Sequence, residues 1–142
     1  MKEAIIFLAS DHAGFSIKEK IKKYLEKHKI QVEDIGPFRY DKNDDYPDYI
    51  IPCAEKVART KNSRGIVIGG SGQGEAIAAN KVNGIRAAVL YTHNKKIIQL
   101  SREHNNANML ALGARFLSEK EALHAVNLWL QTKFSNKEQH KR

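Results

Sequence analysis

Residues 66–75 read Ile66-Val67-Ile68-Gly69-Gly70-Ser71-Gly72-Gln73-Gly74-Glu75, and small residues follow at 76–80. An apolar run, a glycine-rich turn and a small-residue stretch predict a strand, a loop and a helix in succession. Glycines at such a junction let backbone N–H groups turn toward an anion, and the helix N-terminus adds a partial positive charge. Glu75 therefore places a carboxylate beside a predicted anion-binding loop.

The same step from strand to helix recurs along the chain. Apolar runs of strand length occupy residues 4–8, 32–35, 65–68, 85–90 and 109–112, and helical patterns occupy 15–28, 48–60, 75–81, 94–103 and 119–133. This order predicts a three-layer α/β/α sandwich around a five-stranded parallel sheet, a Rossmann-like fold. Because the apolar runs do not alternate with polar residues, we expect the strands to be buried on both faces.

Length and composition narrow the class of protein. The 142 residues fit one domain, 1–142, and no apolar run approaches the roughly 20 residues that cross a bilayer. The N-terminus lacks the apolar region of a signal peptide, and the single cysteine, Cys53, can form no disulfide within the chain. We therefore expect a cytoplasmic protein with no membrane segment, in which Cys53 is a packing residue.

The net charge of +8, from 24 Lys and Arg against 16 Asp and Glu, favours anionic partners. Many of the lysines lie at 18–27, where Ile17, Ile21 and Leu25 trace an apolar helical stripe, so we expect these lysines on a solvated face. A second basic segment is the C-terminal tail, about 133–142. Aromatic residues make up only 8% and do not alternate with basic ones, so we expect no nucleic-acid partner.

Ligands of open parallel sheets bind beyond the carboxyl ends of the strands, near a switch point in strand order. Four segments follow predicted strands, at 10–14, 40–47, 69–75 and 113–115, and we expect all four on one rim. The strand order does not follow from the sequence pattern. Asp11 and His12 lie in the first of these segments, where Asp11 has two open interpretations, a helix cap or a functional acid.

A carboxylate beside an anion-binding loop suits removal of a proton from carbon next to a carbonyl. A plain turn, with Glu75 as a favourable first-turn acid, is the other interpretation. Glu75 stands where a dinucleotide fingerprint beginning at Gly70 requires its third glycine, and no Gly-Lys-Ser/Thr sequence is present. The six histidines form no His-x-x-x-His pair, so we expect no metal site.

Seven segments, in order across almost the whole chain, together resemble the type B ribose-5-phosphate isomerases. They are Ser10-Asp11-His12-Ala13-Gly14, Asp45-Tyr46-Pro47, Gly70-Ser71-Gly72-Gln73-Gly74-Glu75, Ile77-Ala78-Ala79-Asn80-Lys81, Gly84-Ile85-Arg86-Ala87, Arg102-Glu103-His104-Asn105-Asn106-Ala107-Asn108 and Leu112-Gly113-Ala114-Arg115. The resemblance implies interconversion of ribose 5-phosphate and ribulose 5-phosphate through a cis-enediolate, without metal or organic cofactor. The family also contains allose and galactose 6-phosphate isomerases, so an aldohexose 6-phosphate is the alternative substrate. A non-catalytic sugar-phosphate sensor on the same fold is a third interpretation, and a nucleic-acid-binding protein, which the basic charge alone suggests, is the most remote one.

The resemblance also implies roles for individual residues. One subgroup carries a cysteine base just before the glycine loop, where this chain has Gly69, and the other carries a glutamate just after it, which Glu75 matches. By resemblance Asp11 helps to open the sugar ring, and Ser71 stabilises the enediolate oxygens together with the backbone amides of Gly70, Gly72 and Gly74. Tyr46 would line the sugar pocket, and His12 and Arg115 would bind phosphate.

His104 and Asn105 are similar to family residues that reach into the site of a neighbouring subunit. The resemblance therefore implies a homodimer as the minimal active unit, with a tetramer as the other open assembly. Family members usually carry Arg-His-x-x-Arg in the C-terminal tail, and this chain reads Gln139-His140-Lys141-Arg142. His140 matches the family, Gln139 replaces the first arginine, and Arg142 is the nearest substitute for the second.

Overall fold

A computed structural model describes residues 4–142 of the chain. Five parallel strands form one sheet in the order β2-β1-β3-β5-β4. The strands are β1 (Ile5–Ser10), β2 (Gln31–Gly36), β3 (Ser63–Gly69), β4 (Ala87–Leu90) and β5 (Met109–Gly113). The helices are α1 (Phe15–Lys27), α2 (Pro47–Arg59), α3 (Gln73–Asn80), α4 (Lys95–Glu103), α5 (Glu119–Gln131) and α6 (Glu138–Lys141).

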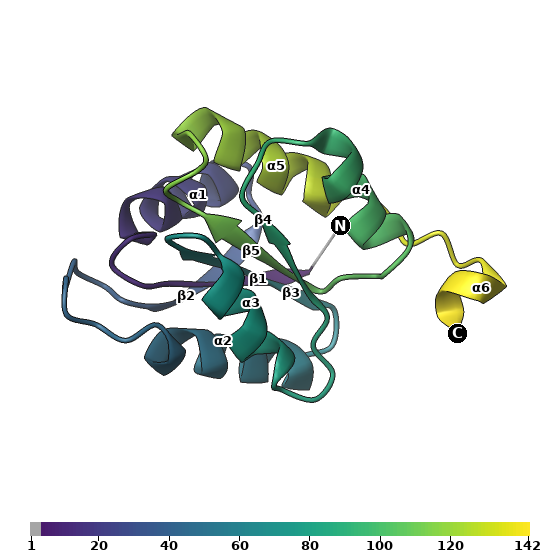
Figure 1. Cartoon of the computed structure of the whole chain (residues 1–142), viewed down its shortest axis with the longest axis horizontal. Helices are drawn as coiled ribbons and strands as arrows, with labels where there is room; N and C mark the ends of the chain where they lie inside the picture. The colour runs from purple at the N-terminus through teal and green to yellow at the C-terminus, as the bar shows by residue number, and fades with distance from the viewer. Residues whose placement is uncertain (1–3) are drawn as a thin grey trace.

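Helices cover both faces of the sheet, as the alternating pattern predicts. Helices α1, α4 and α5 lie on one face, and α2 and α3 lie on the other (Figure 1). Side chains of the central strands alternate between two cores: in β3, Ile66 and Ile68 pack under α1 and α5, whereas Val67 packs on α2 and α3. The three-layer α/β/α fold is confirmed.

The edge strands differ from the expectation of burial on both faces. Most residues of β2 and β4 are only half-buried, whereas β1, β3 and β5 are buried along most of their lengths. Position in the sheet is the reason, because an edge strand has a neighbour on one side only. The apolar run at 85–90 also begins before its strand does, since β4 starts at Ala87.

The strand order creates a switch point in the middle of the sheet. From β1 the chain moves outward to β2 through α1, and from β3 it moves in the other direction through α3. The loops that follow β1 and β3 lead to α1 and α3 on opposite faces of the sheet (Figure 1). In sheets of this kind the crevice that binds a ligand is expected between two such loops. Asp11, His12 and the glycine-rich loop all lie in these two connections.

The expectation that the lysines of 18–27 are all solvated is wrong for Lys18, whose side chain is fully buried. Its ammonium donates to Asp34 Oδ2 at 2.7 Å and to the Pro37 carbonyl at 2.8 Å. Lys18 stands three residues before Ile21 and seven before Leu25, so its Cα lies on the apolar stripe of α1. The bonds of Lys18 fix the start of the long loop between β2 and α2.

We expect Lys18→Ala to lower the free energy of unfolding by about 3 kcal/mol, because it removes one partner of a buried ion pair. Lys20→Ala, an exposed substitution on the same helix, should change it by less than about 0.5 kcal/mol. Urea unfolding followed by circular dichroism measures both values. Equal effects of the two substitutions would contradict a stabilising role for the buried pair.

The basic tail contains a short helix that the sequence pattern does not predict. After α5 the backbone runs extended to α6, which projects from the body of the molecule (Figure 1). The Ser135 N–H donates to the Glu103 carbonyl at 3.0 Å, which ties the tail to the end of α4. Among residues 4–142 no helix is both long and apolar enough to cross a bilayer.

Candidate active site

The glycine-rich loop connects β3 to α3. Gly72 precedes the helix with a φ of 81°, a left-handed conformation that favours glycine. The first N–H groups of α3 have no carbonyl partner within the helix, so they are available as donors to side chains or to a ligand. The Gln73 N–H donates to Ser71 Oγ at 3.2 Å, which leaves the hydroxyl proton of Ser71 free to donate. The loop therefore offers several donors to one anionic group.

Glu75 lies in the first turn of α3 and is buried, with 3% of its surface exposed. Burial raises the pKa of the Glu75 carboxyl above its usual value, and the negative charge of Asp11 adds to this rise. Hydrogen bonds from the backbone N–H groups of Glu75 itself and of Gly72 act in the opposite direction. A buried carboxylate with a raised pKa is a stronger base than an exposed one, and it is typical of proton-transfer sites.

Gly69 makes room for this carboxylate. A Cβ atom on residue 69 would overlap the carboxyl group of Glu75. Any side chain at position 69 must therefore displace Glu75, so a cysteine at 69 and a carboxylate in this position exclude each other sterically. Glu75 can keep its position only if residue 69 is glycine.

Asp11 is held at the rim of the crevice by bonds from both its backbone and its side chain. Its N–H donates to the Ile68 carbonyl at 3.2 Å, and its Oδ1 accepts the Gly14 N–H at 3.1 Å. The second bond stabilises the turn that precedes α1, whose N-cap is Gly14 and has no side-chain hydrogen bond, so Asp11 does not cap the helix itself. Its electrostatic effect on Glu75 places it at the candidate site as well.

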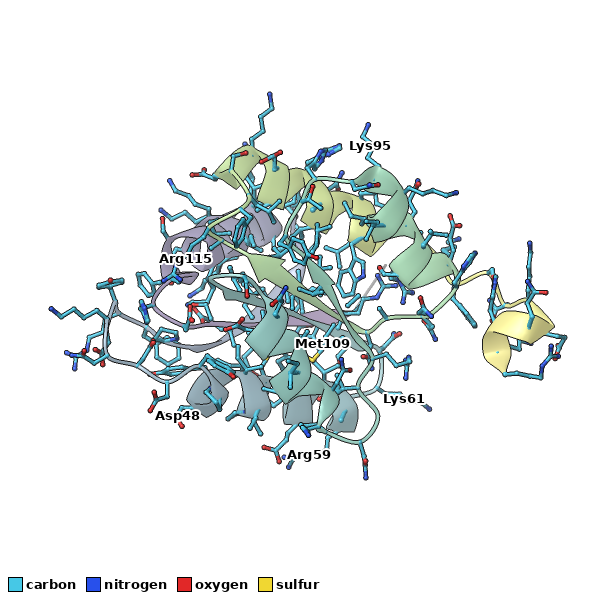
Figure 2. The ribbon with its side chains drawn as sticks, in the orientation of Figure 1. Asp48, Arg59, Lys61, Lys95, Met109 and Arg115 are labelled. Atoms are coloured by element: carbon cyan, nitrogen blue, oxygen red, sulfur yellow. The ribbon has the colours of Figure 1, made fainter. Side chains whose placement is uncertain are left out.

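Arg115 and Tyr46 approach the glycine-rich loop from two other connections. A Cβ atom on Gly70 would lie 3.0 Å from Arg115 Nη1, and one on Gly74 would lie 2.9 Å from the Tyr46 ring. The Arg115 N–H also donates to the Gly70 carbonyl at 3.0 Å. Figure 2 shows Arg115 on the left, at the ends of the strands that carry the connecting loops. The expectation of four segments on one rim is confirmed.

His12 contacts a residue that the sequence pattern does not single out. Its Nδ1 lies 2.8 Å from Asp44 Oδ1, and its backbone N–H donates to the same oxygen at 3.1 Å. Asp44 belongs to the loop between β2 and α2, 32 residues further along the chain. The loop contains several acidic residues, and nothing in its sequence distinguishes Asp44 as the partner of His12. Only the fold brings the two residues together.

Four other expected site residues lie away from the glycine-rich loop. His104 follows the end of α4, where its ring stacks on His140 of the tail with centroids 4.1 Å apart. Asn105 lines a hollow of about 290 Å³ with Arg86 at the start of β4, and Arg142 ends the tail beyond α6. This group lies at the amino ends of the strands, on the right in Figure 1, whereas Arg115 lies on the left in Figure 2. The chain by itself does not bring the two groups together.

Cys53 is a core residue, as its sequence setting predicts. Cys53 is fully buried in α2, and burial together with the charges of Asp34 and Glu33 raises the pKa of its thiol far above the usual range. It therefore stays a thiol and packs in the core. Residues 4–142 contain no group of three or more His, Cys, Asp or Glu side chains arranged to hold a metal ion.

Comparisons with known proteins agree with this geometry. The sequence model of the family described as "Ribose/Galactose Isomerase" matches residues 6–142. "Ribose-5-phosphate isomerase B" of Mycolicibacterium paratuberculosis is 44% identical over 137 residues, which cover 96% of this chain and 85% of that protein. "Probable ribose-5-phosphate isomerase B" of Mycoplasma pneumoniae is 42% identical over 96% of this chain and 89% of that protein.

Solved structures resemble the whole fold. Ribose-5-phosphate isomerase B from Mycoplasma genitalium, solved with bound ribulose-5-phosphate, superposes with a TM-score of 0.94 at 38% identity, covering 100% of this chain and 92% of that one. The Clostridium thermocellum ribose-5-phosphate isomerase B superposes with a TM-score of 0.91 at 43% identity, covering 97% and 91%.

Proposed function

We propose that this chain, which belongs to the ribose/galactose isomerase family, interconverts ribose 5-phosphate and ribulose 5-phosphate. The observation that carries the proposal is the buried carboxylate of Glu75 beside the donors of the glycine-rich loop, at the switch point of the sheet. The names of the relatives and the bound ribulose-5-phosphate in the Mycoplasma genitalium structure support the same substrate.

The reaction needs one base and a cradle for negative charge. Glu75 takes the proton from C2 of the open-chain aldose, and the C2–H electron pair forms the C1–C2 double bond of a cis-enediolate. The Ser71 hydroxyl and the backbone amides of Gly70 and Gly74 stabilise the developing oxyanion. The Gly72 N–H, which the resemblance assigns to the same role, donates to the Glu75 carboxylate instead. Return of the proton to C1, with proton transfer between the two oxygens, completes the ketose. Asp11, held at the same rim, assists opening of the sugar ring.

The other residues of the rim bind the two ends of the substrate. Tyr46, beside Gly74, lines the sugar pocket, and Arg115, beside Gly70, binds phosphate. His12 is a second phosphate contact from the connection after β1. From the tail of a second subunit, His140 and Arg142 complete the phosphate site, with Gln139 in place of the family's first arginine. The single, buried thiol of Cys53 is compatible with the cytoplasm as the compartment.

The alternative substrate is an aldohexose 6-phosphate, because the family model covers galactose isomerases and the tail departs from the usual arginines. We expect the ratio kcat/KM to be highest for ribose 5-phosphate when it is compared with allose and galactose 6-phosphates. Ketose formation from the three sugars in one coupled assay measures the ratio. A higher ratio for a hexose would change the substrate, and no turnover of any of the three would overturn the isomerase proposal.

Two surface features support a shared active site between two copies of the chain. A hollow of about 620 Å³ between α3 and β4 is lined by Gln73, Ile77 and Val89, and Ile77 is 62% exposed. A second hollow shares Ala87 with it and leads to Asn105. This strip therefore runs from the glycine-rich loop to the opposite rim. A two-fold axis through it would place His104 and Asn105 of each copy at the glycine-rich loop of the other.

Mixing two inactive variants tests the shared site. In a hybrid dimer of Glu75→Gln and His104→Ala chains, one site has an intact Glu75 and an intact His104, and the other site has neither. Random subunit exchange should therefore restore about a quarter of the wild-type activity. Each variant incubated alone is the control. If activity does not rise on mixing although mass spectrometry shows hybrids, the site is contained within one chain.

A further inference from the structure

The connection between β2 and α2 contacts His12 through two residues. Asp44 Oδ1 accepts the backbone N–H of His12 and lies 2.8 Å from its Nδ1. Tyr40 packs edge-on against the same imidazole, with centroids 6.2 Å apart and an interplanar angle of 86°. Asp44 therefore fixes the His12 ring through a hydrogen bond in the ring plane, and the Tyr40 ring packs against it and limits its rotation.

The bond to Asp44 determines which nitrogen of His12 is available. An ionised carboxylate has no proton to donate, so the proton of this contact is assigned to Nδ1. Nε2 is then the ring nitrogen that remains for a ligand. When it carries a proton, Nε2 donates a hydrogen bond to an anionic oxygen.

Asp44 is an unusual group for a surface loop, because its side chain is only 3% exposed. Its Oδ2 is buried and has no hydrogen-bond partner, and within residues 4–142 His12 is the one basic side chain within ion-pair distance of the other oxygen, Oδ1. Burying a carboxylate is unfavourable unless a charge compensates it. In the described residues, the backbone N–H and the imidazole of His12 are the groups that face this carboxylate.

We propose that Asp44 is a positioning residue that holds His12 through Nδ1 and presents Nε2–H to the phosphate of the substrate. The inference rests on the proposed role of His12 as a phosphate contact. The proposal links the loop between β2 and α2 to the anion site. The part of the loop that carries Tyr40 and Asp44 begins at Pro37, whose carbonyl accepts a hydrogen bond from the buried Lys18. The loop is thus anchored at its base and closes on His12.

Nuclear magnetic resonance of the ¹⁵N-labelled full chain tests the positioning directly, without turnover. In the wild type we expect the His12 ring signals, assigned from their loss in His12→Ala, to show a protonated Nδ1. In Asp44→Ala the signal of a protonated Nδ1 should disappear, because no acceptor remains for that proton, and the ring is then no longer held with Nε2 toward the phosphate. A ring that keeps its Nδ1 proton in Asp44→Ala would overturn the proposal.

Inorganic phosphate is the probe for the effect on binding, measured from the shifts of the same spectra. We expect Asp44→Ala to raise the Kd for phosphate roughly tenfold, as loss of a hydrogen bond to a charged group predicts. Asp44→Asn keeps an acceptor for Nδ1–H but lacks the charge, so its Kd should lie between those of the wild type and Asp44→Ala. Asp41→Ala is the matched control, because it removes a carboxylate of the same loop that bonds only to the Asn43 N–H.

A double-mutant cycle separates positioning from a general effect on the loop. In the His12→Ala background, Asp44→Ala should leave the Kd for phosphate unchanged, because its effect passes through His12. A full tenfold effect in that background, or no effect of Asp44→Ala in the wild type, would overturn the proposal. If the chain shows no isomerase activity but the cycle gives the expected result, the proposed substrate is wrong while the role of Asp44 stands.

Discussion

Glu75→Gln is expected to lower kcat for ribose 5-phosphate by at least ~10²-fold, the loss typical for removal of a general base. Glutamine has nearly the same shape as glutamate and keeps the contacts of the side chain, but it cannot take a proton. The burial that raises the pKa of Glu75 also keeps water from replacing it as the base.

Two measurements distinguish loss of the base from loss of the fold. Exchange of the C2 proton with deuterium from solvent should fall together with turnover, because both need the same proton transfer. Glu119→Gln, which makes the same chemical change at an exposed position of α5, is the matched control and should retain full activity. Turnover of Glu75→Gln within a few fold of the wild type would contradict the assignment of the base.

The raised pKa of Glu75 also predicts the direction of two pH effects. Activity requires the ionised base, so kcat/KM should fall on acidification at a higher pH than for an ordinary glutamate. Asp11→Asn should move this fall toward lower pH. Because the pKa is higher in the folded state than in the unfolded state, the contribution of Glu75 to stability is present at acid pH and is lost as the pH rises through its folded pKa. At neutral pH the Tm of Glu75→Gln should therefore not lie below that of the wild type.

Gly69→Ala is expected to have the second largest effect, a loss of roughly 10²-fold in kcat. The added methyl group would occupy the volume of the Glu75 carboxyl, so the base must move away from the position in which it is held. A displacement of about 1 Å is enough for a loss of this size, since proton transfer depends steeply on distance. Steady-state kinetics on purified protein measures the loss.

The double variant Gly69→Ala/Glu75→Gln provides the control for this prediction. If Gly69 acts only by leaving room for the base, the double variant should be no slower than Glu75→Gln alone. Additive losses would indicate a separate function of Gly69. Normal turnover in Gly69→Ala would show that catalysis does not depend on the position of the Glu75 carboxylate beside residue 69.

Local sequence patterns were enough to predict the five strands, the helices between them and much of the rim. Strand and helix follow from local periodicity, and the order of the elements requires parallel strands, whose following loops share one edge. The loop at 69–74 could be recognised from its glycines, because close approaches to other atoms and a left-handed conformation at Gly72 both require glycine. Glu75, which stands just after them, was therefore placed correctly beside the loop, and the resemblance to a known family named its proposed role.

The strand order, the partners of Lys18 and the contact of Asp44 with His12 could be found only in the folded chain. Each of these depends on residues far apart in the chain, and a charged side chain in a helix or loop has the same local pattern whether it is solvated or paired. Lys18 and Asp44 are both buried, and a buried polar or charged group needs a partner. In each case the fold supplies that partner from a distant element. The separation of His104 from Glu75 within one chain also depends on the fold, because α4 runs across the sheet and carries His104 away from the glycine-rich loop.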